Sequence, residues 1–354
     1  MIALLLTVDF PPNKGGVSRY YEGLVASSYP KIGIAGVDLG EKPPEGKSLK
    51  IRLKQIFWAK NIIKQTPTEI KILIGQPHLA IGSIIAIRRF ALFIHGGEWG
   101  DYPLGAKLVK LILYRVKVLI TNSNATYKEF IPKSLQSKTI ILKPGLSDFS
   151  SIKNEQDYNR NTDTIKKDFV NIISVARLSP RKGHLRLINA TKMLLKDGLK
   201  VKLKIIGNGN EYEKLYKETQ NQKDIEILTN VSDSELIDLY QDADLFALLP
   251  MRIKGGEAWE GFGIVFLEAG ALGLPIITTN TGGIKESTNP LGTTYLDENC
   301  TEQEIFVEIK KLIGDKNKLI KMGLLNREWA LTHTWKERQN IIDQILEEID
   351  SNSE

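Results

Sequence analysis

Short apolar runs alternate with amphipathic, helix-length segments along nearly the whole chain. Before residue 143, the apolar runs are expected to form strands near 2–8, 31–37, 70–75, 90–94, 117–121 and 138–142. Helical patterns fall between them, near 17–28, 49–65, 78–87, 104–115 and 124–131. Parallel strands need long crossover connections, which are usually helices, so this alternation predicts a parallel sheet with helices on its faces.

A second alternation follows the polar stretch 154–168. Its strands are expected near 169–175, 201–206, 224–228, 244–248 and 275–278, and its helices near 183–196, 210–221, 233–241, 263–272 and 302–313. Two further helical segments, near 316–331 and 335–349, close the chain. A length of 354 residues suits two domains. We therefore predict an α/β protein of two Rossmann-like, doubly wound domains, 1–153 and 169–334, that face each other across a cleft and are joined by the linker 154–168.

The composition limits the kinds of site that the chain can hold. Its single cysteine, Cys300, excludes an internal disulfide and, with only four histidines, leaves no cluster with the spacing of metal ligands. We expect a reducing, cytoplasmic compartment. The apolar residues 1–8 lack a basic leader and are expected to form a buried strand. No apolar run approaches the length of about 18 residues that a membrane-spanning helix needs.

Two carboxylates eight positions apart, Glu260 and Glu268, bracket two glycines and the start of an apolar helix. Gly261 and Gly263 are expected to form a tight turn, which places Glu260 before the helix and Glu268 inside it. Both carboxylates can then face one crevice, where the free N–H groups of the helix start suit a phosphate or a sugar hydroxyl. A capped core helix with two solvated acids explains the pattern equally well, although a carboxylate inside an apolar helix needs a partner.

Three motifs follow strands of the first half. Gly15 and Gly16 open a helix, where bare N–H groups either hold an anion or simply begin the helix. His95 comes directly after the strand at 90–94. It is either a catalytic group or a hydrogen-bonded structural residue. Asn122 and Ser123 follow the next strand.

The second half has a basic turn after its first strand, with Arg177 and Lys182 ahead of a glycine-led helix. Such cations can clamp a pyrophosphate, because arginine offers a planar fork and lysine a point charge, or they can form a solvated basic turn. The stretches Gly207-Asn208-Gly209 and Asn230-Val231 follow the next two strands.

Together these motifs resemble those of the family-4-type retaining glycosyltransferases, which have the GT-B fold. The stretch from Glu260 to Glu268 matches the E-x7-E signature of that family, and Arg177 to Lys182 matches its donor-phosphate motif. The resemblance covers most of the chain in the right order and implies that the last helix, within 335–354, returns to the first domain. Lys143-Pro-Gly-Leu146 departs from the family pattern, in which an Asn-Gly pair is commoner.

The resemblance also implies a role for each motif. His95 would lie near the transferred sugar, Glu260 would hold sugar hydroxyls, and Glu268 would hold the ribose. Arg177 and Lys182 would stabilise the leaving pyrophosphate, with no metal and no cofactor. Asn122 and Ser123 would lie on the acceptor side. The remaining donor-binding residues would be Gly15, Gly16, Gly207, Asn208, Gly209, Asn230, Val231, Gly261, Phe262, Gly263 and Ile264.

We therefore predict a retaining hexosyltransferase that moves a hexose from a nucleotide sugar to a hydroxyl of a glycan or lipid-linked sugar, in the synthesis of cell-envelope polysaccharide, exopolysaccharide or glycolipid. UDP-glucose is favoured as donor over GDP-mannose, although no residue decides between them. Two alternatives remain. One is an inverting GT-B transferase with His95 as its base, and the other is a non-catalytic protein that binds a nucleotide sugar or nucleic acid.

Charge is unevenly distributed, with a net +11 in residues 1–170 and a net −5 in residues 171–354. The basic half includes the helical segment 48–64, which contains Lys50, Arg52, Lys54, Lys60 and Lys64 beside Phe57 and Trp58. Apolar positions 49, 53, 56, 57 and 63 are expected to cover the sheet, which makes this an ordinary crossover helix with a wet face. The alternative is that its basic side chains hold the protein peripherally on the anionic inner face of a membrane.

Overall fold

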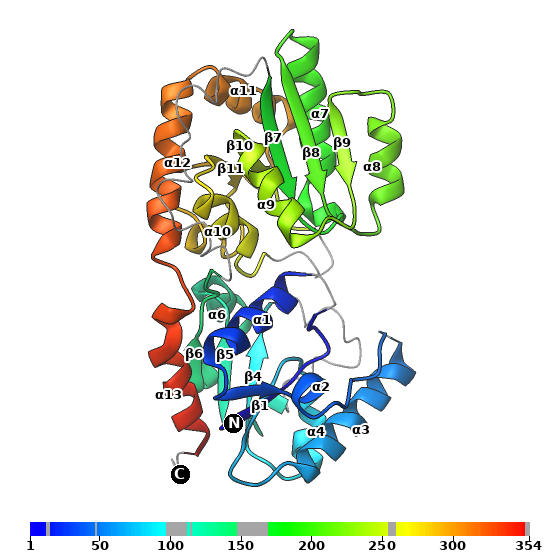
Figure 1. Ribbon diagram of the computed structural model, residues 1–354, viewed down its shortest axis with the longest axis vertical. Helices are drawn as coiled ribbons and strands as arrows, with labels where there is room; N and C mark the ends of the chain where they lie inside the picture. The colour runs from blue at the N-terminus through cyan, green and yellow to red at the C-terminus, as the bar shows by residue number, and fades with distance from the viewer. Residues whose placement is uncertain are drawn as a thin grey trace. The chain divides into compact units, whose positions relative to one another are not determined.

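The computed structural model describes residues 1–11, 15–46, 48–96, 112–113, 115–146, 169–253 and 260–350. These residues form two compact units, the first unit (1–146 and 334–350) and the second unit (169–253 and 260–333). Each unit contains a six-stranded parallel sheet with helices packed on it (Figure 1), which confirms the two predicted Rossmann-like folds. The predicted linker 154–168, and the predicted helix 104–115 except for three of its residues, lie outside the described residues.

The sheet of the first unit has the order β2-β1-β3-β4-β5-β6. Its strands are β1 (Ala3–Leu6), β2 (Ile32–Ile34), β3 (Lys71–Ile74), β4 (Phe90–Ile94), β5 (Val118–Thr121) and β6 (Thr139–Ile141). Its helices are α1 (Gly16–Ser28), α2 (Ala35–Asp38), α3 (Leu49–Gln65), α4 (Ala80–Ile85), α6 (Asn124–Phe130) and α13 (Gln339–Asp350). The order reverses between β1 and β3, and ligands of such sheets bind beyond the carboxyl ends of the strands at that reversal.

The sheet of the second unit has the order β12-β11-β10-β7-β8-β9, with its reversal between β7 and β10. Its strands are β7 (Val170–Val175), β8 (Val201–Ile206), β9 (Ile225–Leu228), β10 (Leu245–Leu248), β11 (Ile276–Thr279) and β12 (Thr293–Leu296). Its helices are α7 (His184–Lys196), α8 (Tyr212–Thr219), α9 (Asp233–Asp242), α10 (Ile264–Ala271), α11 (Glu302–Ile313) and α12 (Lys316–Leu331). The central strands are buried almost throughout, because helices cover both faces of a parallel sheet.

The C-terminal helix α13 belongs to the first unit, as predicted. It buries four apolar side chains, Ile342, Ile345, Leu346 and Ile349. Two surface ion pairs flank this contact, Lys31 with Asp343 at 2.8 Å and Lys71 with Asp350 at 2.9 Å. Such exposed pairs contribute little, so the buried apolar side chains hold the helix in place.

The junction before α13 leaves no room for a side chain at Gly145. A Cβ there would collide with the backbone of Trp335, next to the parallel bridge between Leu146 and Thr334. We therefore expect Gly145→Ala to lower the free energy of unfolding by about 1–3 kcal/mol, as overpacking does. Chemical denaturation measures this change. Gly36→Ala is the matched control, because a Cβ there meets only ordinary contacts, and equal losses in both variants would contradict the prediction.

Three elements differ from the sequence-based expectation. Strand 31–37 ends early because the Asp38 carboxylate accepts a hydrogen bond from Ile34 N–H and the chain turns into α2. The edge strand β12 was not predicted. In α3, Leu49, Leu53 and Phe57 do not cover the sheet as expected, since they are 72%, 50% and 57% exposed. Each helix among the described residues is too short or too polar to cross a membrane.

Candidate active site

The basic turn after β7 holds the first carboxylate of the E-x7-E stretch. A short 3-10 helix (Pro180–Lys182) turns Lys182 inward, where its Nζ forms an ion pair with Glu260 Oε2. Arg181 adds a second ion pair to the same oxygen at 3.2 Å. Lys182 and Glu260 are both buried, so their cluster is a built feature of the second unit.

The cluster keeps Glu260 ionised. Burial by itself would raise the pKa of this carboxyl, but Lys182 and Arg181 outweigh that effect and lower the pKa below its usual value. Burial also lowers the pKa of Lys182, and the Glu260 carboxylate opposes that shift. Arg177 is exposed on the same turn and close enough to act on Lys182 electrostatically.

The loops that follow β7 and β8 lie against each other because of two glycines. A Cβ on Gly207 would collide with the carbonyl of Ala176, and a Cβ on Gly209 with that of Leu178. Between these glycines, Asn208 O accepts a hydrogen bond from Leu178 N–H at 2.9 Å. The glycines that the sequence suggested for phosphate contact are therefore required first for the packing of the two loops.

The loop after β9 joins the same group. Asn208 Nδ2 donates to Asn230 Oδ1 at 3.3 Å, and Asn230 has a positive φ of 57°. Val231 follows it. The structure thus brings together, at the carboxyl ends of β7, β8 and β9, the predicted residues Arg177, Lys182, Gly207, Asn208, Gly209, Asn230 and Val231.

The E-x7-E stretch has the predicted local form. Gly263, with a φ of 86°, precedes α10, so Glu260 lies before the helix and Glu268 inside it. The backbone of Glu260 is fixed because its carbonyl accepts from Gly283 N–H at 2.8 Å. Phe262 is buried, whereas Gly261 and Ile264 are partly exposed at the turn. The side chain of Phe262 therefore serves the core.

Glu268 is deeply buried and has a protein partner. It is 3% exposed, and the hydroxyl of Tyr240 on α9 donates to its Oε2 at 3.3 Å. This contact supplies the partner that a carboxylate inside an apolar helix requires.

If Glu268 holds the ribose of a nucleotide-sugar donor, as the resemblance implies, Glu268→Gln should lower the donor affinity by about 1.5–3 kcal/mol, the value of a charge-assisted hydrogen bond. The glutamine oxygen still accepts from Tyr240, so the free energy of unfolding should change little. Calorimetric titration with the donor nucleotide measures the affinity. Tyr240→Phe is the control, because it removes the hydroxyl and leaves the carboxylate. Unchanged affinity in Glu268→Gln would remove Glu268 from the donor site.

In the first unit, His95 follows β4 and lies among aromatic rings. The Tyr21 hydroxyl donates to Gly75 O at 2.7 Å and lies 2.8 Å from His95 Nε2, so this nitrogen carries the hydrogen and donates. Burial lowers the pKa of His95 to about 4. Tyr20 and Phe93 also contact the ring. A neutral imidazole with Nε2–H already bonded is a poor general base near pH 7.

Of the other predicted residues of the first unit, some lie beside open space and others are used by the fold. Gly16 begins α1, no side chain caps the helix, and a Cβ on Gly16 would meet open space among the described residues. Gly15 precedes it in extended backbone. Ser123 is instead the N-cap of α6, since its Oγ accepts from Thr126 N–H at 2.9 Å. The Oδ1 atom of neighbouring Asn122 is buried without a hydrogen-bond partner in the described part of the chain.

The sequence analysis missed three residues of these clusters. Arg181 binds Glu260, and the signal available was its place next to Lys182 in a dibasic pair. Tyr20 and Tyr21 surround His95, and the only signal was a pair of adjacent aromatics early in α1.

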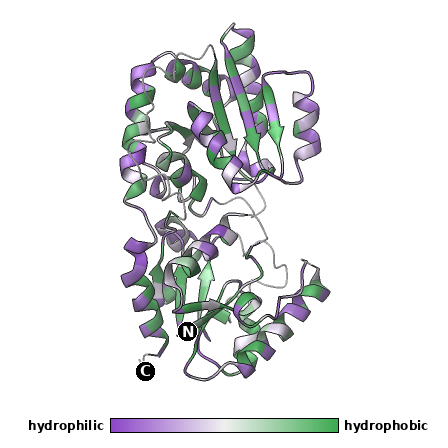
Figure 2. Cartoon of the chain, in the orientation of Figure 1, coloured by the Kyte–Doolittle hydropathy of each residue, from purple (hydrophilic) through white to green (hydrophobic). Residues whose placement is uncertain are grey.

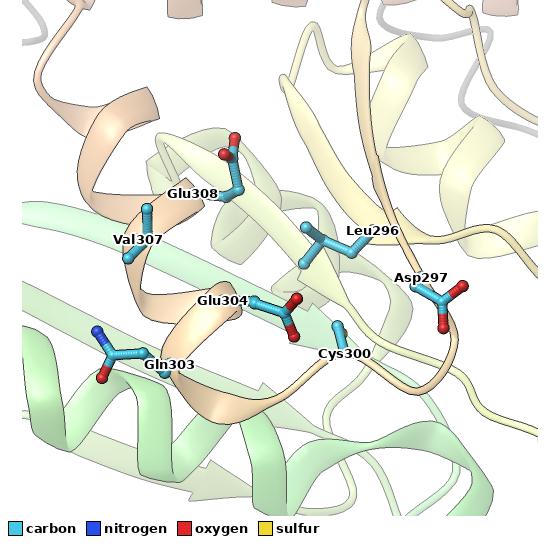
Figure 3. Close-up of a pocket in the computed structure, with 7 residues that line it drawn as sticks. All are labelled: Leu296, Asp297, Cys300, Gln303, Glu304, Val307 and Glu308. Atoms are coloured by element: carbon cyan, nitrogen blue, oxygen red, sulfur yellow. The ribbon is translucent and has the colours of Figure 1, made fainter.

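A separate pocket lies between β12 and the start of α11 (Figure 3). Its lining consists of Leu296, Asp297, Cys300, Gln303, Glu304, Val307 and Glu308. No predicted site residue is among them, and the three carboxylates make it unsuited to an anionic nucleotide. In the described ranges, no group of three or more histidine, cysteine or acidic residues is arranged to hold a metal ion.

Comparison with known proteins identifies the family. Residues 155–329 match the model of the family "Glycosyl transferases group 1". The chain is 32% identical to a GDP-mannose-dependent alpha-(1-6)-phosphatidylinositol monomannoside mannosyltransferase of Mycobacterium tuberculosis, over 94% of each chain. This protein belongs to the group 1 glycosyl transferases. It is also 25% identical to the protein of the same name from Mycolicibacterium smegmatis, over 97% of each chain.

A solved structure supports the fold of this glycosyltransferase. Anabaena HepE, in complex with UDP and glucose, superimposes with a TM-score of 0.74 at 20% identity, covering 98% of this chain and 99% of that one. This superposition confirms the predicted GT-B fold, and the family to which the chain belongs confirms the prediction of a glycosyltransferase enzyme. The non-catalytic alternative is set aside.

Proposed function

We propose that this protein is a retaining hexosyltransferase that moves a hexose from a nucleotide sugar to a hydroxyl of a glycan or lipid-linked sugar acceptor. The observation that carries the proposal is the charge of the cluster at the end of β7. Arg177, Arg181 and Lys182 together with Glu260 leave two net positive charges. The pyrophosphate of a nucleotide sugar carries two negative charges, so donor and site balance.

GDP-mannose is the favoured donor, so mannose would be the transferred sugar. The two mannosyltransferases to which the chain is similar along nearly its full length are named as GDP-mannose-dependent. UDP-glucose, which the sequence analysis preferred, is the second candidate. The structure of Anabaena HepE in complex with UDP-glucose, a fold neighbour at 20% identity, supports this second candidate. The phosphatidylinositol acceptor in the names of the mannosyltransferases favours a lipid-linked acceptor.

The proposed chemistry depends on holding the leaving group. Arg177, Lys182 and backbone N–H groups would stabilise the charge that develops on the pyrophosphate as the glycosidic bond breaks. Glu260 would orient the sugar hydroxyls. The departing phosphate oxygen would then take the proton of the acceptor hydroxyl on the same face, which retains the anomeric configuration. The low pKa of His95 favours this course over an inverting one with His95 as base.

One assay tests the reaction and the donor. Purified protein is incubated with GDP-mannose or UDP-glucose and a polyprenyl- or phosphatidylinositol-linked sugar, and both free nucleotide and the anomer of the product are measured. We expect turnover with GDP-mannose and a product of retained configuration. An inverted product would overturn the retaining mechanism, and turnover with UDP-glucose alone would overturn the donor assignment.

We expect Arg177→Ala to lower kcat/KM by about 10–100-fold, the loss of a charge-assisted hydrogen bond to phosphate. The protein cations act as counter-charge, so EDTA should leave turnover of the unaltered enzyme intact. Lys196→Ala, an exposed change at the end of α7, is the control and should keep full activity. Complete loss in EDTA with recovery on adding a divalent ion would contradict the metal-free mechanism.

A further inference from the structure

The outward side of α3 exposes a row of large apolar side chains. Leu49, Leu53 and Phe57 are spaced by four residues, which places them along one face of the helix, and at least half of each side chain is exposed. This face is not needed for the fold. The sheet is covered instead by Trp58, Ala59, Ile62 and Ile63 on the opposite side of α3.

Lysines border the apolar stripe. Lys50, Lys54, Lys60 and Lys64 lie on the same outward half of the helix, and none has an acidic partner in the described part of the chain. The helix Leu49–Gln65 contains no acidic residue at all. In Figure 2, hydrophobic and hydrophilic bands alternate along the outward-facing α3. We call this stripe with its four lysines the α3 face.

Polar contacts fix the rotation of α3, so the exposure of the α3 face is built in. Gln55 Nε2 donates to Pro44 O at 2.7 Å, and its Oε1 lies 2.8 Å from His78 Nε2. Trp58 Nε1 donates to Glu41 O at 3.0 Å. Turning the helix to bury Leu53 and Phe57 would break these three contacts, of which the one between Gln55 and His78 is buried and therefore costly to lose.

We propose that the α3 face docks the protein on an anionic lipid bilayer. The lysines of the α3 face can bind the phosphates of the lipid headgroups. The exposed leucines and phenylalanine can enter the boundary between headgroups and acyl chains. Gln55 contacts His78, which follows β3, so the N-terminal half of α3 lies at the strand-end edge that also carries His95. This proposal rests on the α3 face and does not depend on the transfer reaction.

The test is co-sedimentation of the full chain with vesicles of phosphatidylcholine alone or mixed with phosphatidylglycerol. We expect binding to the anionic vesicles only, weakening as salt rises from 50 to 500 mM, since charge attraction is screened. Lys50→Glu, Lys54→Glu and Lys64→Glu together should lower the partition coefficient at least about 100-fold, because each lost lysine contributes about fivefold and each new glutamate is repelled by the anionic lipids.

The matched control makes the same charge change elsewhere. Lys196→Glu, Lys200→Glu and Lys217→Glu are exposed positions of the second unit, and both triple variants reduce the formal net charge from +6 to 0. The control should keep most of its binding. Equal losses in both triples would show attraction by net charge alone and would overturn the proposal.

The apolar stripe is tested separately with Leu53→Ser and Phe57→Ser. We expect this double variant to lose about tenfold in binding at high and low salt alike, because apolar burial is not screened. Val307→Ser and Leu324→Ser, two similarly exposed apolar positions of the second unit, should bind like the unaltered protein. Absence of salt-sensitive vesicle binding in the unaltered protein would overturn the proposal, whatever the transfer activity.

Discussion

The free energy of unfolding is expected to fall by about 4 kcal/mol between pH 7.5 and pH 5.5. Three histidines, His78, His95 and His184, are buried as neutral rings, and burial lowers the pKa of each to about 4. In the unfolded chain the same rings titrate near pH 6.5. Between these values the unfolded state binds more protons, so stability falls as the pH falls.

The size follows from the two pKa values. At pH 5.5 each histidine contributes a loss of about 1.4 kcal/mol, and the loss grows until the pH reaches about 4. Two of the three rings belong to the first unit and one to the second, so the first unit should lose about twice as much. Glu260 lowers the free energy of unfolding further only below about pH 4.5, because its pKa in the folded state lies below the ordinary value.

Urea denaturation at the two pH values measures the difference. His78→Gln keeps a donor toward Gln55 and removes one titrating group, so the pH-dependent loss should shrink by about 1.4 kcal/mol in that variant. A free energy of unfolding that is the same at pH 7.5 and 5.5 would contradict the buried, neutral state of these histidines.

The elements with strong periodicity could be predicted from the sequence, whereas their rotation could not. The predicted helix 49–65 and α3 coincide, because Ser48 caps its start and a hydrogen bond from Thr66 N–H closes its end. The predicted inward face was wrong for Leu49, Leu53 and Phe57, although Ile63 is buried as expected, because apolar side chains occur around most of this helix. The choice between faces depends on Gln55 and Trp58, whose partners come from another segment of the chain.

The edge strand β12 shows a second limit. Its residues Thr293–Leu296 are mostly half-exposed and mix threonine with apolar side chains, so they lack the continuous apolar run of a central strand. These residues form a strand because they pair with β11, and the local sequence does not predict that pairing.

In the candidate site, the chemical types were predictable and their partners were not. The spacing of Arg177 and Lys182 indicated a cationic turn, and the turn is there. That Lys182 and Arg181 bind Glu260, some 78 residues later, follows only from the reversal between β7 and β10. Ser123 illustrates the opposite case, since a polar residue after a strand is as suited to capping a helix as to binding a substrate.

The Lys182–Glu260 pair gives the largest effect expected of a single substitution. Lys182→Met keeps the apolar stem of the side chain. Among the described residues, it leaves Arg181, which is 26% exposed, as the remaining ion-pair partner of the buried Glu260 carboxylate. Removing one partner of a buried ion pair costs about 3–5 kcal/mol, because the other charge stays buried without its closest counter-charge. We expect the free energy of unfolding to fall by that amount without any donor present.

A double-mutant cycle separates this pairing from general damage to the turn. Glu260→Gln leaves Lys182 buried and unpaired, so it should cost a similar amount, whereas Lys182→Met with Glu260→Gln should cost less than the two single losses added together. Arg177→Met, an exposed cation on the same turn, is the control and should leave stability nearly unchanged. Strict additivity of the two single losses would mean that the ion pair does not stabilise the turn. A combined loss smaller than the sum would instead mean that Glu260 and Lys182 stabilise each other by charge attraction. The two side chains would then already be held in place before the donor pyrophosphate binds.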